Sequence, residues 1–365
     1  MISKKLGIVE SIVDRNGELD DIRVNINGEI QRAYNYPKIT GNINLGDEVL
    51  LNTTAVELSL GTGGYHFVIA NLNNLESNFT EGGHIMKLRY TPFQVKVDSV
   101  EEQESEYHKS IEGFSSLDNT PVVVGSLHSM LTPFAASYKR LNPSKKLVYI
   151  MTDGAALPIY LSKNVDTLKK KELIDNTITI GSAFGGEYEC INIYTALITA
   201  KEVLKADAIF VSMGPGIAGT GTKYGFTGIE QGPILDAVKK LGGMPISIPR
   251  ISFADQRDRH KGISHHSITV LKEIVNVSVN IPICIYSDDK LNYIKNQLKT
   301  NELDLKHNIV YVKNENSKDD LGYFELKVRS MGRNFDQDKE FFEAASTAAY
   351  YLTEVCNDSR RENHK

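Results

Sequence analysis

The sequence predicts an α/β protein in which a small N-terminal β-barrel precedes a doubly wound, mostly parallel Rossmann-like sheet. Short strands with turn signals fill the chain before residue 98, and apolar runs alternate with helical patterns after residue 118. A chain of 365 residues is long enough for two domains and a sizeable core. We expect a barrel over residues 1–97, an acidic linker over 98–118, a Rossmann-like domain over 119–356 and a disordered tail over 357–365.

Composition indicates a soluble, cytoplasmic protein. Hydrophobic residues make up 41% and charged residues 24% of the chain, and the net charge of −5 gives no global basic footprint for nucleic acid or membrane. No apolar run is long enough to cross a bilayer, and the first residues lack the apolar region of a signal peptide. The three cysteines are far apart and odd in number, which fits a reducing compartment.

Two hairpin signals open the barrel. An apolar run over residues 6–13 ends at Asp14-Arg-Asn-Gly17, and an alternating run over 21–26 ends at Asn27-Gly28. Further short strands at this spacing are typical of an OB-like or SH3-like barrel. Such barrels often bind nucleic acid, but the interleaved basic and aromatic surface that such binding needs is not evident. We therefore favour a structural or docking module and expect no nucleic-acid partner.

The second part of the chain reads as a parallel sheet covered on both faces. Its apolar runs lack polar alternation, as expected of buried parallel strands, and helical patterns lie between them. The strand candidates are residues 121–124, 147–151, 177–180, 208–213, 245–248, 283–286 and 308–312. Residues 336–356 predict a long amphipathic helix at the end.

A glycine-rich run, Gly214-Pro-Gly-Ile-Ala-Gly-Thr-Gly-Thr222, follows the strand candidate 208–213. Glycine permits close backbone approach, so successive N–H groups can converge on an anion while hydroxyls add donors. The run is neither a Walker loop nor a dinucleotide fingerprint, and a sharply turned loop without a ligand is the alternative. We expect the ligand-binding residues of this run to be Gly214, Gly216, Gly219, Thr220, Gly221 and Thr222.

Other strand ends also carry chemically useful side chains, at the edge where ligands bind in such sheets. Four of the nine histidines lie there, and three chemistries compete for them. In the first, Arg257 and Arg259 clamp an anion. In the second, His260 or His265 works as an acid–base group, with Asp255 or Asp153 orienting it.

The third chemistry is a metal site, which the sequence leaves open. Imidazole and carboxylate suit zinc, manganese or iron, but adjacent histidines diverge on a helix or strand. Its candidate ligands are His128, Asp153, Asp255, His260, His265 and His266. His128 and Glu187 are also candidate ligand-binding residues at the sheet edge. The structural alternative is a salt-bridged turn at 257–259, with Ser264 capping a helix.

Two long motifs carry a resemblance to a known family. They are Met213 to Thr222 and Ser252-Phe-Ala-Asp-Gln-Arg-Asp-Arg-His-Lys-Gly-Ile-Ser-His-His266, with Gly46 to Thr54 and Gly83 to Tyr90 in support. The chain resembles an uncharacterised bacterial family known only as a domain of unknown function. The resemblance spans nearly the whole chain and implies no activity.

These observations favour an enzyme that acts on a small anionic ligand by hydrolysis or group transfer. The ligand is expected to contain a phosphate group or a nucleotide, because the arginine segment and the glycine run fit an anion best. A non-catalytic sensor that binds such a ligand and reports through the barrel is the alternative. The sequence gives no cofactor and leaves homo-oligomerisation open, and we expect no membrane partner.

Overall fold

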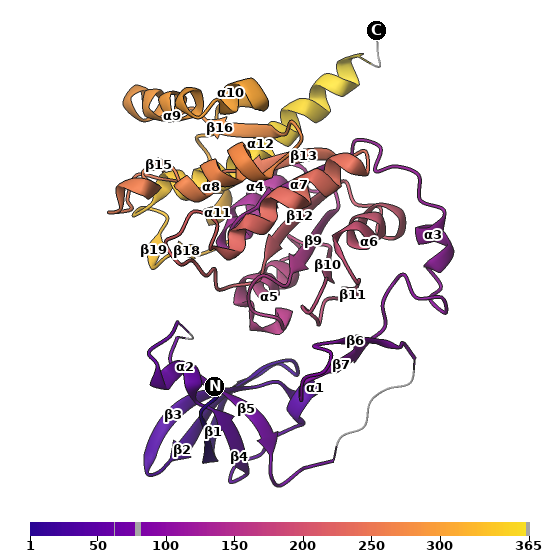
Figure 1. The fold of residues 1–365 in the computed structure, drawn as a ribbon, viewed down its shortest axis with the longest axis vertical. Coiled ribbons are helices and arrows are strands. Elements are labelled where there is room, and N and C mark those ends of the chain that lie inside the picture. The colour runs from indigo at the N-terminus through magenta and orange to yellow at the C-terminus, as the bar shows by residue number, and fades with distance from the viewer. Residues whose placement is uncertain (62, 77–81, 363–365) are drawn as a thin grey trace. The chain divides into compact units, whose positions relative to one another are not determined.

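The computed structural model describes residues 1–61, 63–76 and 82–362. The chain forms two compact units, Met1–Lys96 and Val97–Lys365 (Figure 1). The first is a closed β-barrel and the second an α/β sheet, as the sequence predicts. The sequence placed this division at residue 97.

The barrel is closed by five strands: β1 (Lys4–Arg15), β2 (Asp20–Ile26), β3 (Glu29–Asn35), β4 (Glu48–Asn52) and β5 (Tyr65–Asn71). They pair in the order β1-β2-β3-β5-β4, and β4 returns to β1, which leaves no open edge. The turn between β2 and β3 has positive φ at Asn27 and Gly28, the conformation of a tight two-residue hairpin. Short helices α1 (Pro37–Thr40) and α2 (Thr54–Glu57) and the pair β6 (Ile85–Lys87) and β7 (Val95–Val97) complete this part.

The barrel has a core of its own. Strand β2 alternates between fully buried and partly buried residues, so Ile22, Val24 and Ile26 point inward. Val49 and Leu51 of β4 meet them from the other side of the barrel. The alternation that predicted strands here is therefore the one that fills the interior.

The second unit is built on eight parallel strands. Their order is β11-β10-β9-β12-β8-β13-β16-β17. Their bounds are β8 (Pro121–Gly125), β9 (Leu147–Thr152), β10 (Asn176–Thr179), β11 (Tyr188–Glu189), β12 (Ala208–Met213), β13 (Met244–Ile248), β16 (Asn280–Cys284) and β17 (Asn308–Val312). Seven of these correspond to the predicted runs. The two-residue edge strand β11 has no such run, because it is too short to show a pattern.

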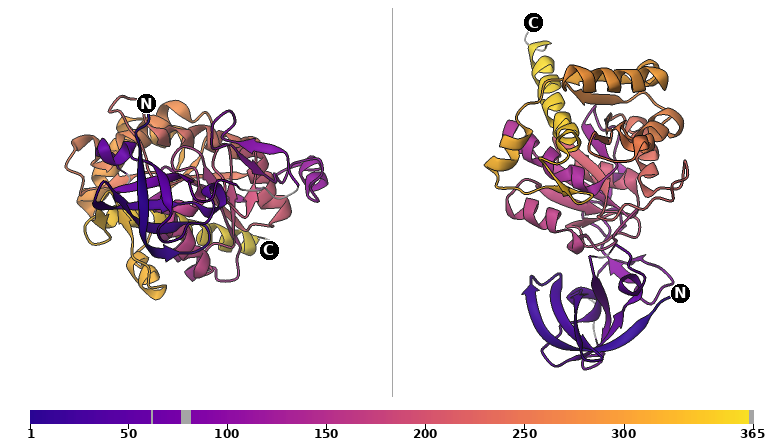
Figure 2. Two further views of the ribbon diagram at one scale, coloured as in Figure 1. Left: turned by 90° about the horizontal axis from the view of Figure 1, so that it is seen from below. Right: turned by 90° about the vertical axis from the view of Figure 1, so that its left-hand side faces the viewer.

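Helices cover both faces of this sheet, which makes it doubly wound (Figures 1 and 2). One face packs against α4 (Leu131–Leu141), α5 (Lys163–Lys170), α11 (Ser317–Tyr323) and α12 (Lys339–Glu362). The other packs against α6 (Ile193–Ile198), α7 (Gln231–Lys240), α8 (His265–Thr269), α9 (Asp288–Thr300) and α10 (Leu303–Lys306). Helices α6 and α8 continue into the π-helical segments η3 (Thr199–Val203) and η6 (Val270–Ile274).

Short elements fill the connections. They are the pairs β14 (Ile251–Ser252) with β15 (Gly262–Ile263) and β18 (Arg329–Ser330) with β19 (Arg333–Asn334), and the 3₁₀ turns η1 (His128–Met130), η2 (Ile159–Leu161), η4 (Thr227–Glu230) and η5 (Asp258–His260). Within the described residues, no helix is both long and apolar enough to span a bilayer.

Neighbouring strands are followed by helices on opposite faces at several places in the sheet, and β8 has such a neighbour on each side. Strand β8 lies between β12 and β13 and is followed by α4 on one face. Strands β12 and β13 are followed by α7 and α8 on the other face. Their connections therefore separate at the carboxyl end of β8, where a crevice opens in sheets of this kind.

Residues 98–118, expected as an acidic linker, pack on the second unit. Ser99 forms a bridge with Glu189, Val100 is buried in the core, and α3 (His108–Glu112) follows. The final helix, α12, extends to Glu362, so it overlaps the tail expected over 357–365. Residues 363–365 of that tail lie outside the described residues.

Candidate functional site

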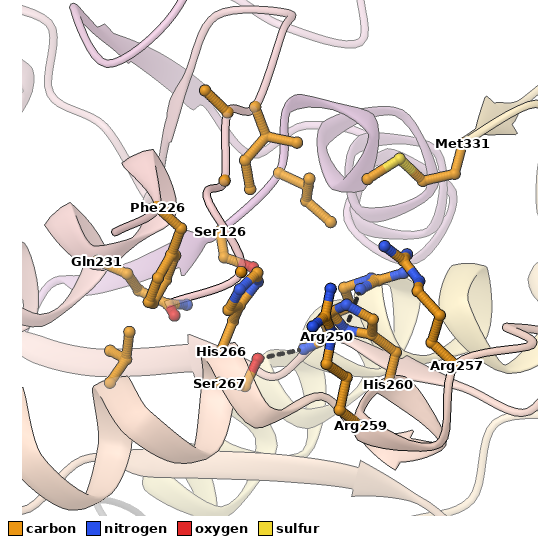
Figure 3. A pocket seen from close by; sticks show the side chains of 17 residues that line it. Ser126, Phe226, Gln231, Arg250, Arg257, Arg259, His260, His266, Ser267 and Met331 are labelled. Carbon is orange, nitrogen blue, oxygen red and sulfur yellow. Dashed lines mark hydrogen bonds between the residues drawn. The ribbon is translucent and has the colours of Figure 1, made fainter. Parts of the chain in front are cut away.

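A pocket of about 210 Å³ lies at the carboxyl ends of β8, β12 and β13, in the crevice that the topology predicts. Ser126 contributes to it from just after β8, Gly219 and Gly221 from the loop after β12, and Arg250 from just after β13. In Figure 3 the arginines lie on one side and Phe226 and Gln231 on the other. His266 lies between these two groups.

The glycine-rich run shapes one wall of the pocket with its backbone. Gly219 forms a bridge with Phe226, and the N–H of Thr220 donates to the carbonyl of Gly225, so the run folds back on itself. Gly214 is packed under Ala156, where an added Cβ would lie 2.6 Å from a carbonyl oxygen. Gly214 thus serves close packing, while Gly219 and Gly221 line the pocket.

The two threonines of this run face their own turn. Thr220 Oγ1 lies 2.8 Å from Thr222 Oγ1 and donates to the carbonyl of Gly225 over 3.0 Å. Both side chains are exposed and neither lines the pocket, and the same is true of Gly216. The threonines therefore stabilise the loop in this structure. The sequence predicts ligand contacts for all three residues, and the pocket in this structure does not include them.

The loop is bonded to η6 beside the pocket. Lys223 Nζ lies 2.6 Å from Glu273 Oε1, and the Tyr224 hydroxyl donates to the other oxygen of that carboxylate over 2.5 Å. The ring of Phe226 stacks on His266 with centroids 4.0 Å apart and planes 14° apart. These contacts fix the loop beside the pocket and hold the plane of the His266 ring.

Asp255 holds the arginines of the site. Arg257 donates to both carboxylate oxygens over 2.9 Å, and Arg250 donates to Asp255 Oδ2 over 2.8 Å. The bonds from Arg257 hold the pKa of Asp255 well below its usual range, against the opposing effect of burial. The expected role of Asp255, orienting a histidine, is not the one that the structure shows, because guanidinium groups occupy both of its oxygens.

Arg259 differs from its neighbours. Its side chain is exposed, lines the pocket and has no acidic partner among the described residues. Three arginines and no aspartate or glutamate are found among the described residues that line the pocket. Since Asp255 balances one of these charges, the pocket keeps an excess of positive charge.

His260 is buried and its orientation is set by Arg250. Nδ1 of His260 lies 2.7 Å from an Arg250 guanidinium nitrogen and 2.7 Å from Ser264 Oγ. A guanidinium has only donors, so Nδ1 accepts and the neutral ring carries its proton on Nε2. Burial and the charge of Arg250 lower the pKa of His260 to about 3, so the ring is neutral near pH 7.

The two adjacent histidines have different surroundings. Ser264 caps α8 by accepting from the N–H of His266, which places His265 and His266 on successive positions of the helix. Nε2 of His265 is enclosed by protein and has no hydrogen-bond partner within the part of the chain that the structure describes. His266 lines the pocket, and neither of its ring nitrogens is enclosed or bonded within the described residues. Burial lowers the pKa of both, and that of His266 falls to about 4.

The sequence predicts His260 or His265 as the acid–base group. His266, which lines the pocket, was not included in that prediction. The adjacent letters give no preference between His265 and His266, since only the helix position decides which ring turns toward the pocket. The signal that was available is Ser264, which marks the start of the helix.

The three histidines also form the one group that could hold a metal ion among the described residues, with ligand atoms within 4.8 Å of one another. A metal-bound histidine normally donates its second N–H to a carbonyl or carboxylate. Here Nδ1 of His260 accepts from Arg250, so Nε2 carries the proton and is a donor. With three arginines nearby, the arrangement favours an anion over a cation.

Three expected site residues have structural partners elsewhere. His128 is buried, with Nε2 2.6 Å from Ser162 Oγ, and desolvation lowers its pKa to about 4. Asp153 accepts from the N–H of Ser182, and Glu187 accepts from the N–H of Thr177. None of the three lines the pocket.

A carboxyl group that the sequence did not single out lies near the end of β9. Thr152 Oγ1 donates to Glu230 Oε1 over 2.5 Å. Burial, and then the charge of Asp153, raise the pKa of Glu230 to about 7. A lone glutamate before a helix carries no sequence signal of burial, so only the packing identifies it.

The comparisons with known proteins identify a family and no activity. The model of a family described as "Protein of unknown function (DUF3866)" matches residues 32–349, most of the chain. No curated protein matches the sequence. The match includes both the glycine-rich run and the arginine–histidine segment.

Proposed function

The chain belongs to the DUF3866 family, whose function is unknown, and we propose from the pocket that it is an enzyme acting on a small phosphate-containing anion. The reaction class is hydrolysis or group transfer. The phosphate-containing ligands of this proposal include nucleotides that place their phosphate end in the pocket. The observation that carries the proposal is the excess of arginine over carboxylate in the pocket.

The charge of the pocket suits a phosphate group. Arg250, Arg257 and Arg259 carry three positive charges, and Asp255 balances one of them, which leaves an excess of two. A phosphate monoester carries a charge of about −2 near neutral pH. Guanidinium forks match phosphate oxygens, and the backbone at Gly219 and Gly221 lets a ligand approach closely.

The histidines supply the chemical group that such an enzyme needs. Among the described residues of the pocket only His260 and His266 have side chains that titrate near pH 7 in water. His260 is held as a hydrogen-bond donor by Arg250, whereas His266 offers an unprotonated, accessible nitrogen. We therefore assign the reactive role to His266 in place of His260 or His265.

The first test is a calorimetric titration with inorganic phosphate. Arg259→Gln is expected to weaken binding by about 1–3 kcal/mol, the scale of a hydrogen bond to a charged group. Arg89→Gln is the matched control, because Arg89 is an exposed arginine of the barrel unit. Equal affinity in Arg259→Gln and wild type contradicts the proposal.

The second test separates an enzyme from a sensor. Wild type and His266→Gln are incubated with a panel of phosphoanhydrides, acyl phosphates and phosphate esters, and released phosphate is measured. The proposal expects turnover in wild type that is lost in His266→Gln while phosphate binding is retained. Binding without turnover of any compound favours the sensor that reports through the barrel.

A further inference from the structure

We propose that His266 is a nucleophile that accepts a phosphoryl group from a small acyl phosphate or phosphoanhydride, forming a phosphohistidine. This inference rests on the proposed phosphate-binding function and names its substrate class and covalent intermediate. It concerns the second unit alone.

Of the three clustered histidines, His266 is the one with a nitrogen available for attack. Nδ1 of His260 is taken by Arg250 over 2.7 Å, and Nε2 of His265 is enclosed by protein. His266 lines the pocket with both ring nitrogens unbonded within the described residues. Stacking on Phe226, with centroids 4.0 Å apart, holds its ring plane. A fixed ring and an open nitrogen are what an in-line attack on phosphorus requires.

The His266 ring is unprotonated when it faces the arginines. Burial is the main cause of its lowered pKa, followed by the charges of His265, Arg250, Arg259 and Arg257. These arginines also offset the negative charge of an incoming phosphoryl group. The same charges thus keep the lone pair free and reduce its repulsion from the substrate.

The pocket offers few other nucleophiles. Its described lining contains no cysteine, lysine, tyrosine or acidic side chain. Two hydroxyl groups are present, from Ser126 and Ser267. Ser267 Oγ is buried and accepts the N–H of Arg250 over 2.8 Å. No histidine nitrogen is bonded to the Ser126 hydroxyl among the described residues, so Ser126 has no base positioned to activate it.

The lack of an acid in the pocket selects the leaving group. In the proposed step a lone pair of His266 forms the N–P bond while the P–O bond to the leaving oxygen breaks, and that oxygen departs with the bonding electrons. An alkoxide from a phosphate ester would need a proton, and the described lining of the pocket holds no protonated acid to supply one. A carboxylate or phosphate departs as a stable anion without a proton. The other ring nitrogen keeps its proton, and water or an acceptor later takes the phosphoryl group.

The test uses the full chain with acetyl phosphate as the probe. Samples are quenched rapidly in alkali over a series of times, and intact mass and peptide mapping locate the phosphoryl group. A phosphohistidine is stable in alkali and labile in acid, whereas a phosphoserine has the opposite stability. The expected result is one alkali-stable group on His266, absent in His266→Gln and equally present in His108→Ala, whose residue lies on α3 away from the pocket.

The outcomes separate this inference from the function on which it rests. A phosphoryl group on Ser126, or no group on His266 at any time in a protein that binds phosphate, overturns the nucleophile. Failure of wild type to bind inorganic phosphate overturns the proposed function itself. Retained phosphate binding in His266→Gln shows that the variant is folded, so a lost label then reports the missing nitrogen.

Discussion

The Arg250 guanidinium donates a hydrogen bond to Nδ1 of His260 over 2.7 Å. The same guanidinium donates to Asp255, so a carboxylate, an arginine and a histidine form one buried chain. The sequence predicts a carboxylate that orients a histidine directly. In the structure the arginine stands between them, which holds His260 neutral and keeps positive charge at the pocket.

Asp255→Asn is expected to destabilise the protein by about 3–5 kcal/mol, because it leaves the buried Arg250 without a balancing charge. The pKa of Asp255 is lowered on folding, so its contribution is present above the unfolded pKa and is lost as pH falls through the folded pKa. Urea unfolding measures the change. Asp258→Asn is the control, since Asp258 is exposed and forms no ion pair within the described residues. Equal loss in the two variants would contradict the role of Asp255.

Arg257→Lys and Arg259→Lys are expected to differ in phosphate affinity. The guanidinium of Arg257 already donates two hydrogen bonds to the carboxylate of Asp255, whereas Arg259 has no acidic partner in the described chain. Arg259→Lys should weaken phosphate binding about tenfold, because a lysine keeps the charge but cannot form the bidentate hydrogen bonds of a guanidinium. Arg257→Lys should weaken phosphate binding by a smaller factor. Calorimetric titration with inorganic phosphate measures the affinity of each variant. A larger loss in Arg257→Lys would make Arg257 the main clamp, whereas the sequence alone predicts that Arg257 and Arg259 share this role.

Glu230→Gln is expected to stabilise the protein at alkaline pH. The folded pKa of Glu230 is raised from 4.5 to about 7, so the folded state binds more protons between these values and wild-type stability falls as pH rises through them. Glutamine still accepts the hydrogen bond from Thr152 and carries no charge. The substitution therefore removes up to about 3 kcal/mol of the fall in stability with rising pH. Unfolding free energies on either side of the window measure it, with exposed Glu104→Gln as control. Identical pH profiles would show that Glu230 is solvated.

Residues 1–97 expressed alone are expected to fold and to bind no oligonucleotide. The barrel is closed and has its own core, so it needs no strand from the second unit. Cooperative thermal unfolding followed by circular dichroism tests folding, and fluorescence titration at low salt tests binding. Oligonucleotide binding that weakens with added salt would identify a nucleic-acid surface on the barrel.

Local patterns in the sequence determined the architecture of both units. Alternation and the Asn27-Gly28 turn predict the barrel strands, and seven short, mostly apolar runs predict the buried parallel strands. These features are local because strand burial and turn geometry depend on residues close together in the chain. The position of the ligand edge also follows, because ligands bind outside the carboxyl ends of the strands in such sheets.

The tertiary structure alone decided which polar residues meet in the pocket. Thr220 and Thr222 lie against Gly225, and the ring of His128 is hydrogen-bonded to Ser162. All three residues lie in segments that the sequence predicts to bind a ligand. His266 enters the pocket because Ser264 fixes the start of α8 and Phe226 stacks on the ring. Such outcomes depend on the direction of single side chains and on partners distant in sequence. A residue's type supplies its chemistry, whereas packing and charge neighbours determine whether that chemistry faces a ligand.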